Sequence, residues 1–411
     1  MSFTMLRLSF VAIALAVLSV GATPLVQVRE PKVSLPFTLR LNTSGKRIPD
    51  IDRARAAQLL ENVKTKSGPS RRTVSFDVTN EAVTYAANIG VGTPATTYSL
   101  LIDTGSSNTW VGAGKAFVET SSTELTGDEV AVEYGSGFFI GEEAIDTVTL
   151  AEGLTISGQS IGVALISEGF DGVDGILGLG PVDLTGGTVA GASTVPTISD
   201  NLFSQGTISQ EVVGVFFAPT QSLDITNGEL SFGGTDTSKI TGDITFVPVT
   251  SSSPANEFWA IDQTITYGTT DRVIQSSIAG IVDTGTTLVL LATDAFNTYT
   301  SLTKATEDDT TGLLTITTAN YANLQSLFFN IGGTSFEFTK NAQTWPRALN
   351  TAIGGSAESI FLIVSSLGAS SEEGFSFVNG FTFLERFYSV FDTTNNQVGF
   401  ATTAHTDDTT N

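Results

Sequence analysis

The sequence predicts a mainly β protein in which two lobes meet at one shared site. The 411-residue chain is rich in Thr, Ser, Val and Gly, and its many short alternating apolar runs are broken by Gly, Asn and Asp. This pattern is typical of antiparallel strands. Residues 100–107 and 280–287 each place an aspartate after an apolar run and before Thr-Gly and two hydroxyl residues. Because Asp103 and Asp283 lie about one domain's length apart, each lobe is expected to supply one carboxylate.

A single Asp-Thr-Gly sequence is weak evidence for a functional site. Aspartate and threonine hydrogen-bond the local backbone and glycine supplies positive φ, so all three are common in tight turns. Two copies with the same apolar prefix, the same hydroxyl suffix and domain-length spacing instead indicate a function.

Three further segments carry a resemblance to a known family. Residues 132–137 read Val-Glu-Tyr-Gly-Ser-Gly, residues 173–180 read Val-Asp-Gly-Ile-Leu-Gly-Leu-Gly, and residues 378–380 read Val-Asn-Gly. With the two motifs, these segments resemble the pepsin-like aspartic proteases over about 79–403, and within that family the secreted basidiomycete enzymes. The resemblance implies a bilobal pepsin-like fold with two pseudo-symmetric β lobes and an active-site cleft between them. The family usually has two apolar residues before the last glycine, so Asn379 is a departure that bears on the packing behind Asp283.

Composition restricts the possible chemistry. The chain has no cysteine, which excludes thiol catalysis, disulfides and thiolate metal sites. Its one histidine, His405, lies in a polar tail and is expected to be a solvated terminal residue. A Ser-His-Asp triad or a multi-histidine zinc site is therefore disfavoured, and carboxylates are the leading catalytic candidates for a hydrolase. We expect no metal and no cofactor.

Charge divides the chain into a basic beginning and an acidic remainder. Residues 1–80 contain 12 Lys or Arg and five Asp or Glu, whereas the rest contains seven and 37. An acidic body argues against nucleic acid as a partner because phosphates would be repelled. After the leader, no segment has the length and uniform apolarity of a membrane span.

The first 22 residues have the features of a secretory signal peptide. Arg7 precedes a 13-residue apolar stretch from Leu8 to Val20, and small residues follow it. A short membrane anchor is the alternative, but 13 residues cannot cross a hydrocarbon core of about 30 Å as a helix. We expect a secreted, extracellular protein with a signal peptide at 1–22, a basic pro-segment at 23–79, an N-terminal catalytic lobe at 80–240 and a C-terminal catalytic lobe at 241–411.

The basic segment at 23–79 is either a solvated extension or, as the resemblance implies, an inhibitory pro-segment that covers the acidic cleft. Residues 51–64 are rich in Ala, Leu, Gln and Arg and predict a helix that begins near Asp50. Lys64 or Lys66 is the expected cation over the two aspartates. Release would be triggered by acid, as the carboxylates are protonated and the attraction fades.

Two processing features also lie before the predicted lobes. Arg71-Arg72 is a candidate dibasic cleavage site, with self-cleavage as the alternative. The sequon Asn42-Thr43-Ser44 lies in the removable part, so the mature protein would carry no N-glycan.

Two carboxylates can hydrolyse an amide if one is ionised and the other protonated. Repulsion between them separates their apparent pKa values, so the pair retains one proton over an acidic range. The amides of Gly105 and Gly285 can hydrogen-bond the carboxylates, and the hydroxyls of Ser106 and Thr286 can bond the outer oxygens. We expect water held between the carboxylates to attack the scissile carbonyl without a covalent intermediate.

The resemblance assigns roles to the residues around the two aspartates. It implies that Asp103 is the proton donor to the carbonyl, that Asp283 is the initial base, and that Thr104 and Thr284 lock the two loops together. Sequence physics alone does not rank the two aspartates.

The resemblance also assigns the substrate contacts. Tyr134 would close over bound substrate with its hydroxyl directed to Trp110, which can equally be a core residue. The amides of Gly135 and Ser136 would bind an extended peptide as an added strand. The other expected substrate contacts are Gly105, Gly285 and Thr286, with Leu101 and Ile176 lining an apolar pocket.

The predicted function is a secreted aspartic endopeptidase made as a zymogen and active on peptides at acidic pH, and the resemblance implies a monomer. One alternative is a non-catalytic binding or inhibitor protein with the same fold. A second is another carboxylate-pair enzyme such as a glycosidase, which does not explain two Asp-Thr-Gly sequences. A third is a structural β-sandwich, which does not explain the basic leader beside an acidic body.

Overall fold

The computed structural model describes residues 33–41, 46–65, 83–135, 137–223, 225–269, 272–371 and 374–411. Several predictions from the sequence fall outside these ranges. They are the signal peptide at 1–22, the sequon at Asn42, the candidate cation Lys66, the processing pair Arg71-Arg72, and Ser136 of the Tyr-Gly-Ser-Gly segment.

Strands make up most of the regular structure, which confirms the predicted mainly β class. The strands are β1 (Val33–Leu41), β2 (Val83–Val91), β3 (Thr96–Asp103), β4 (Trp110–Val111), β5 (Glu124–Glu133), β6 (Phe138–Ala151), β7 (Leu154–Glu168), β8 (Gly175–Gly178), β9 (Val212–Phe216), β10 (Thr226–Phe232), β11 (Thr245–Pro248), β12 (Ala260–Tyr267), β13 (Arg272–Val282), β14 (Val289–Leu291), β15 (Thr306–Glu307), β16 (Leu314–Thr315), β17 (Leu327–Ile331), β18 (Thr334–Phe338), β19 (Phe361–Leu362), β20 (Val364–Ser366), β21 (Phe377–Asn379), β22 (Phe387–Asp392) and β23 (Gln397–Thr402). The α-helices are α1 (Ile48–Thr65), α2 (Ile198–Ser204), α3 (Thr293–Thr303), α4 (Thr318–Ala322) and α5 (Phe381–Leu384).

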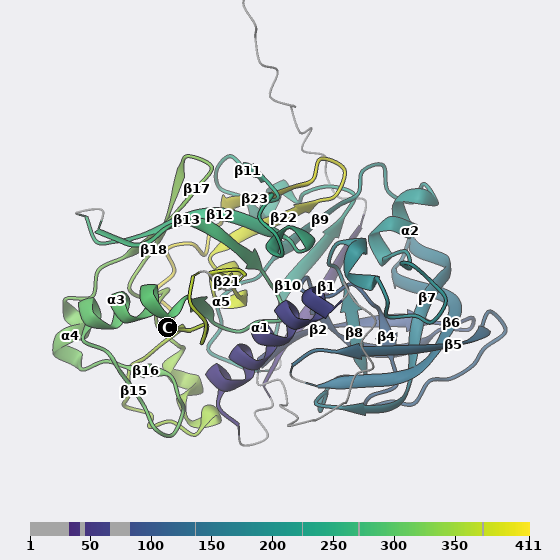
Figure 1. Ribbon diagram of the computed structural model, residues 1–411, viewed down its shortest axis with the longest axis horizontal. Helices are drawn as coiled ribbons and strands as arrows, with labels where there is room; N and C mark the ends of the chain where they lie inside the picture. Colours follow the sequence, from purple (N-terminus) through teal and green to yellow (C-terminus); the bar gives the residue numbers. More distant parts are fainter. Residues whose placement is uncertain are drawn as a thin grey trace, which may run out of the picture.

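The largest sheet joins the two halves of the chain. Its 13 strands run in the order β11-β23-β22-β9-β10-β1-β2-β3-β8-β4-β7-β6-β5. The late strand β22 pairs antiparallel with β9, and β1 lies between β10 and β2. The predicted boundary between the lobes at residue 240 therefore does not divide the structure into separate sheets, because strands from both sides of it belong to this 13-stranded sheet. Figure 1 shows the sheet extending from the centre of the molecule to the β5–β7 layer.

The same strand arrangement occurs once in each half and positions the two aspartates. In the first half β3 runs parallel to β8, and Asp103 lies opposite Gly178. In the second half β13 runs parallel to β21, which also pairs with β14. Both aspartate strands are buried toward their ends, as their apolar sequences predict, so each one delivers its carboxylate from within the core.

Asn379, the residue that departs from the family pattern, is accommodated by a partner within the core. Its side chain is fully buried, and its Nδ2 donates to Oε1 of Gln263 at 2.9 Å. Gln263 Nε2 donates back to Asn379 Oδ1 at 3.3 Å, and the Asn379 carbonyl accepts from the Asp283 amide. A reciprocal pair of amides thus satisfies the polar side chain behind Asp283.

Replacing Gln263 with leucine is expected to destabilise the protein by about 1–3 kcal/mol, because the buried Asn379 amide loses its partner. The thermal unfolding midpoint should fall, and the double variant Gln263→Leu/Asn379→Val should recover most of the loss. A single variant as stable as the parent would show that the pair is not needed.

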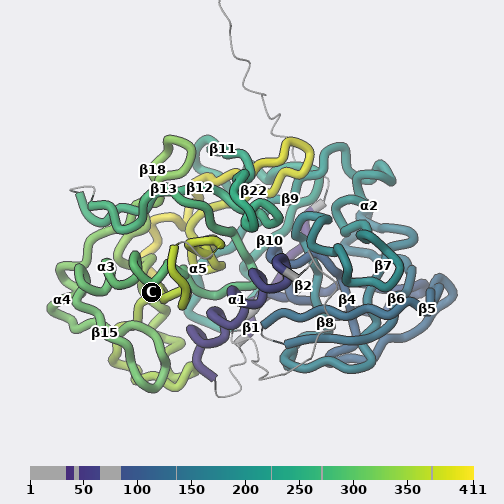
Figure 2. Tube along the Cα trace, in the orientation of Figure 1, coloured from purple at the N-terminus to yellow at the C-terminus, as the bar shows by residue number. Residues whose placement is uncertain are grey.

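Helix α1 lies between the two halves of the molecule and confirms the helix predicted from residues 51–64. In Figures 1 and 2 it crosses between the β5–β8 strands and the region that contains α3 and α4. One stripe of the helix is buried, including Ile51, Leu59, Leu60 and Val63. Apolar residues spaced three and four positions apart lie on one side of a helix and form such a stripe. Within the described ranges, no helix has both the length and the apolarity needed to cross a membrane.

Candidate active site

The two aspartates lie together in the interior, each held by its own turn. Asp103 and Asp283 are both fully buried. Asp103 Oδ1 accepts from the Gly105 amide at 2.9 Å, and its Oδ2 accepts from Ser106 Oγ at 2.5 Å. The second turn repeats this arrangement, with the Gly285 amide at 3.0 Å from Asp283 Oδ1 and Thr286 Oγ1 at 2.6 Å from Oδ2. The orientation of each carboxylate is therefore fixed by two donors from the residues that directly follow it.

The threonines after the aspartates join the two turns to each other. The Thr104 amide donates to Thr284 Oγ1 at 2.9 Å, and the Thr284 amide donates to Thr104 Oγ1 at 3.0 Å. Each hydroxyl then donates across the interface, Thr104 to the Val282 carbonyl and Thr284 to the Ile102 carbonyl. Four hydrogen bonds thus hold the two carboxylates in one geometry.

Both turns need glycine because the opposite carboxylate approaches so closely. A Cβ atom at Gly105 would lie 2.6 Å from Asp283 Oδ1, and one at Gly285 would lie 2.8 Å from Asp103 Oδ1. Real Cβ atoms do not come this near to other heavy atoms, so a larger residue would force the two loops apart.

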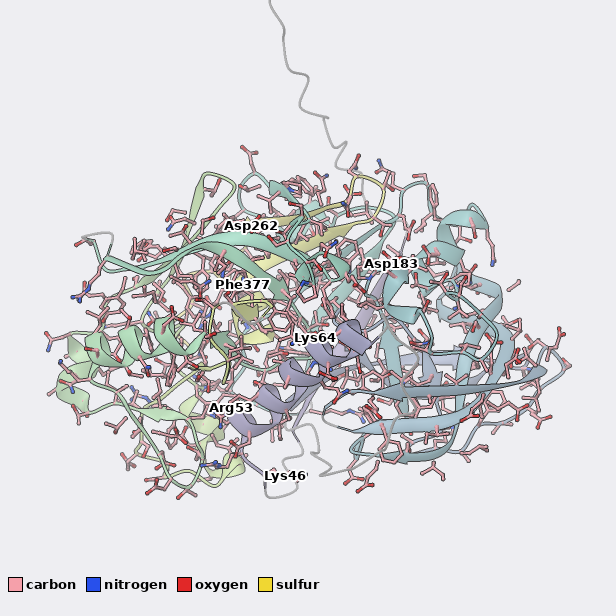
Figure 3. The ribbon with its side chains drawn as sticks, viewed as in Figure 1. Lys46, Arg53, Lys64, Asp183, Asp262 and Phe377 are labelled. Atoms are coloured by element: carbon pink, nitrogen blue, oxygen red, sulfur yellow. The ribbon has the colours of Figure 1, made fainter. Side chains whose placement is uncertain are left out.

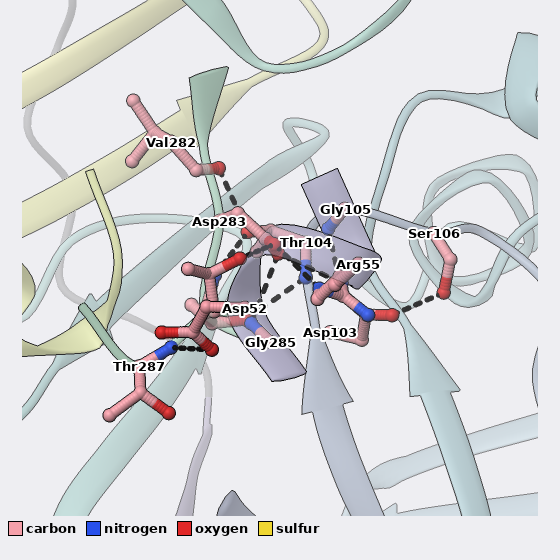
Figure 4. Close-up of polar contacts among 12 residues, drawn as sticks. Asp52, Arg55, Asp103, Thr104, Gly105, Ser106, Val282, Asp283, Gly285 and Thr287 are labelled. Atoms are coloured by element: carbon pink, nitrogen blue, oxygen red, sulfur yellow. Dashed lines mark hydrogen bonds and ion pairs between the residues drawn. The ribbon is translucent and has the colours of Figure 1, made fainter. Parts of the chain in front are cut away.

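The cation between the aspartates is Arg55 of α1 and not, as expected, Lys64; the other candidate, Lys66, lies outside the described residues. Arg55 Nη2 lies 2.5 Å from Asp103 Oδ1, and Nε lies 2.8 Å from Asp283 Oδ2. Nη2 also donates to Asp283 Oδ1 at 3.1 Å. Figure 4 shows the guanidinium between the two carboxylates. Lys64 is exposed at the far end of the helix, where Figure 3 labels it.

Helical spacing places Arg55 on the buried side of α1. Arg55 lies four residues after Ile51 and four before Leu59, inside the buried stripe, and is only 1% exposed. A planar guanidinium can also bind two carboxylates at once, whereas an ammonium group is a single point charge. The signal in the sequence is that Arg55 is a basic residue at the same helical spacing as the apolar residues of the stripe.

Asp52 provides a second polar contact between α1 and the site, and the sequence analysis missed it. Its buried carboxylate accepts from the Thr287 amide at 3.1 Å and from the Leu288 amide at 2.8 Å. Burial raises the pKa of Asp52 to about 7, against the lowering effect of these hydrogen bonds and of Arg55. The helix is thus attached both to the two aspartates and to the loop that follows Asp283.

The two aspartates titrate differently in this state. Burial and the charge of Asp283 raise the pKa of Asp103, although Arg55 opposes them. Burial also acts to raise the pKa of Asp283, but the charge and hydrogen bond of Arg55, with the bonds from Thr286 and Gly285, outweigh it and lower that pKa. Asp283 is therefore the more acidic member of the pair.

Aromatic rings surround Tyr134, the tyrosine expected to cover the site. Its ring is stacked on Trp110 with centroids 6.4 Å apart, and Phe170 meets both rings edge-on. Among the described residues Trp110 Nε1 has no hydrogen-bond partner, so the two side chains meet through their rings. Leu101 and Ile176 belong to the same buried cluster, so the structure brings all four predicted residues together.

The hairpin that carries Tyr134 rests on α1. Gly135 has φ +71°, and a Cβ atom there would clash with the Ala54 carbonyl. At the base of the hairpin, Glu133 accepts from Gln58 Nε2 at 3.1 Å through its carboxylate and from Asn62 Nδ2 at 2.7 Å through its carbonyl. The helix therefore occupies the space between this hairpin and the two aspartates.

His405 lies away from these groups and is not a freely solvated residue, contrary to the prediction. Its Nδ1 lies 2.6 Å from Asp408 Oδ2, and its ring packs 5.8 Å from that of Phe216. In the described part of the chain, no contact joins it to either aspartate.

A buried pair of aspartates on matching Asp-Thr-Gly turns is the arrangement expected of an aspartic protease. The chain belongs to the eukaryotic aspartyl protease family, whose model matches residues 84–403. The protein is an aspartic endopeptidase with a pepsin-like fold. It is 61% identical over 339 residues to polyporopepsin of Irpex lacteus, covering 82% of this chain and 99% of that protein. Rhizopuspepsin of Rhizopus chinensis is 32% identical over 378 residues, covering 86% and 91%. The crystal structure of the aspartic proteinase from Irpex lacteus superposes with a TM-score of 0.80 at 55% identity, covering 92% of this chain and 99% of that one.

Proposed function

We propose that Asp103 and Asp283 form the catalytic dyad, which hydrolyses peptide bonds at acidic pH through one activated water. The observation that carries this proposal is the matched pair of buried carboxylates, each fixed by an amide and a hydroxyl. Once α1 has left, the space occupied by the Arg55 guanidinium is available for water and a scissile peptide. The ionised aspartate removes a proton from water, the protonated one donates to the carbonyl oxygen, and proton return to nitrogen breaks the C–N bond.

We propose Asp283 as the initial base and Asp103 as the proton donor, as the resemblance implies, and the pKa directions while Arg55 is bound follow the same order. The pKa of Asp283 is lowered and that of Asp103 is raised. A pair that shares one proton would then hold it mainly on Asp103.

The substrate is a peptide, as in the family, and we propose that it binds in extended form beneath the 132–137 hairpin. The position of α1 supports this, because its backbone at Ala54 already contacts Gly135. Ser136, Gly105, Gly285 and Thr286 would provide further polar contacts. Leu101 and Ile176 would form an apolar wall with the Trp110 ring.

The segment before the family domain acts, in this proposal, as an intramolecular inhibitor. Strand β1 lies within the large sheet and α1 covers the dyad, so the helix must leave before a substrate can enter. Arg55 holds the pKa of Asp283 below its usual value, so docking favours the ionised form of this carboxylate and weakens as it takes up a proton. Asp52 and Asp103 have the opposite effect, because their raised pKa values mean that protonation favours the docked state. Release is therefore expected only where Asp283 takes up a proton, which lies below the ordinary aspartate pKa of about 4.

The remaining proposals rest on sequence features. The apolar stretch after Arg7 supports a secreted, extracellular protein with a signal peptide at 1–22. We propose a pro-segment over 23–79, lobes over 80–240 and 241–411 that share one sheet, and a monomeric enzyme. The acidic body supports the absence of nucleic-acid and membrane partners.

The test is cleavage of casein at pH 3 to 4 by the acid-processed chain, with and without pepstatin, and with a polysaccharide as the control substrate. We expect cleavage of casein alone, and its abolition by pepstatin. A correctly folded and processed protein that cleaves neither substrate would instead support a non-catalytic binding protein.

A further inference from the structure

A polar hollow in the C-terminal half has no role in the chemistry described above. It has a volume of about 190 Å³ and lies between β13 and the start of α3, both visible in the left half of Figure 1. It is lined by Val273, Ile274, Gln275, Ser276, Ile278, Ala292, Asp294 and Ser371.

Gln275 is the unusual member of this lining. Its side chain is only 5% exposed, yet among the described residues neither its Nε2 nor its Oε1 has a hydrogen-bond partner. Leaving such a group buried and unsatisfied is costly, and buried polar atoms in folded proteins nearly always have partners. A carboxamide offers a donor and an acceptor side by side, the same pair that a peptide group presents.

The strand that carries Gln275 also has an unpaired edge. On one edge β13 pairs with β12 from Arg272 to Ile281. On the other edge β21 pairs only at Ile281 and Val282, and the Ser376 amide bonds Ala279. Between Arg272 and Ile278, no backbone group in the described part of the chain pairs with this second edge. Val273 is 53% exposed there, so the edge is accessible to an added strand.

One residue of the lining, Ser371, lies in the sequence between two glycines that approach α1. Cβ atoms at Gly368 and Gly374 would meet Arg53 and Leu60 of that helix. In the same segment, the Ala369 carbonyl accepts a hydrogen bond from the Thr293 amide. This bond fixes Ala369 to the start of α3. Residues on either side of Ser371 thus lie against the helix that covers the dyad.

We propose that this hollow and the open edge of β13 form an accessory site that binds an extended polypeptide segment of the substrate outside the cleft. The inference rests on the proposed peptidase function. The segment would add as a strand to Arg272–Ile278 and place a peptide group against the Gln275 amide. Asp294, exposed at the rim, would favour a basic side chain at that position.

The test compares two substrates with the same cleavage sequence in acid-processed enzyme made from the full chain. One is a peptide of about eight residues, about 26 Å when extended, and the other is an unfolded polypeptide of about 30 residues, about 100 Å when extended. Gln275→Leu should lower kcat/KM for the long substrate about fivefold or more, mainly through KM, and change the short one by less than about twofold. Asp294→Asn should act in the same direction on long substrates that carry Lys or Arg.

The matched control is Gln325→Ala, which removes an exposed glutamine of the same half. Equal kcat/KM for the parent and Gln275→Leu on the long substrate would overturn the accessory site, as would an equal loss on both substrates. Because the parent's rate on the short peptide tests the peptidase function separately, the two proposals can fail independently.

Discussion

Replacing Asp283 with asparagine is expected to lower kcat/KM for peptide cleavage by about 10³-fold or more, because the dyad loses its ionised member and cannot deprotonate water. Asp103→Asn should cause a comparable loss by removing the proton that is donated to the carbonyl. Each variant keeps one oxygen that can accept from the glycine amide of its turn, and its NH2 group can donate to the hydroxyl in place of the second oxygen. The measurement is the initial rate on a fluorogenic peptide at pH 3 to 5, after processing with an added protease.

Variants of the supporting hydroxyls provide the matched control. Ser106→Ala and Thr286→Ala each remove one hydrogen bond to a carboxylate and leave the charge in place. We expect losses of about 10-fold, together with a shift of the pH profile, because each hydroxyl lowers the pKa of its aspartate. If either dyad variant retained activity within about tenfold of the parent, the proposed mechanism would be wrong.

Replacing Arg55 with alanine is expected to abolish the latency of the full-length chain. The substitution leaves two buried carboxylates without their cation, and removing one partner of a buried ion pair costs about 3–5 kcal/mol. The docked state should lose population by about 10²-fold or more, so peptide cleavage should appear at pH 5 to 6, where the parent chain stays inactive. The measurement is the initial rate within the first minutes, with a gel to show that the chain is still intact.

Two further arginine variants make this test specific. Arg53→Ala removes an arginine of the same helix whose partner is Asp50 rather than the dyad, and it should stay latent. Arg55→Lys should be partly latent, because lysine keeps the charge but cannot bridge both carboxylates as a planar fork does. An Arg55→Ala chain as latent as the parent would show that apolar packing and Asp52 hold the helix without the ion pair.

The sequence by itself determined the parts of the site whose interactions are local. Each carboxylate is bonded by residues two and three positions later, so the two repeated turns already contain their own geometry. The glycines and hydroxyl residues could therefore be predicted by position. The buried stripe of α1 was also visible as a helical pattern, although the charge at its centre was not recognised.

Only the tertiary structure decided which distant groups meet. Arg55 contacts aspartates 48 and 228 positions away, and Gln263 pairs with an asparagine 116 positions away. The pairing of β22 with β9 likewise placed strands from both halves in one sheet. Turn and helix geometry fix contacts over a few residues, so their patterns are repeated in the sequence. Long-range contacts depend on how whole elements pack, which is why the inhibitory arginine and the unpaired Gln275 emerged only from the fold.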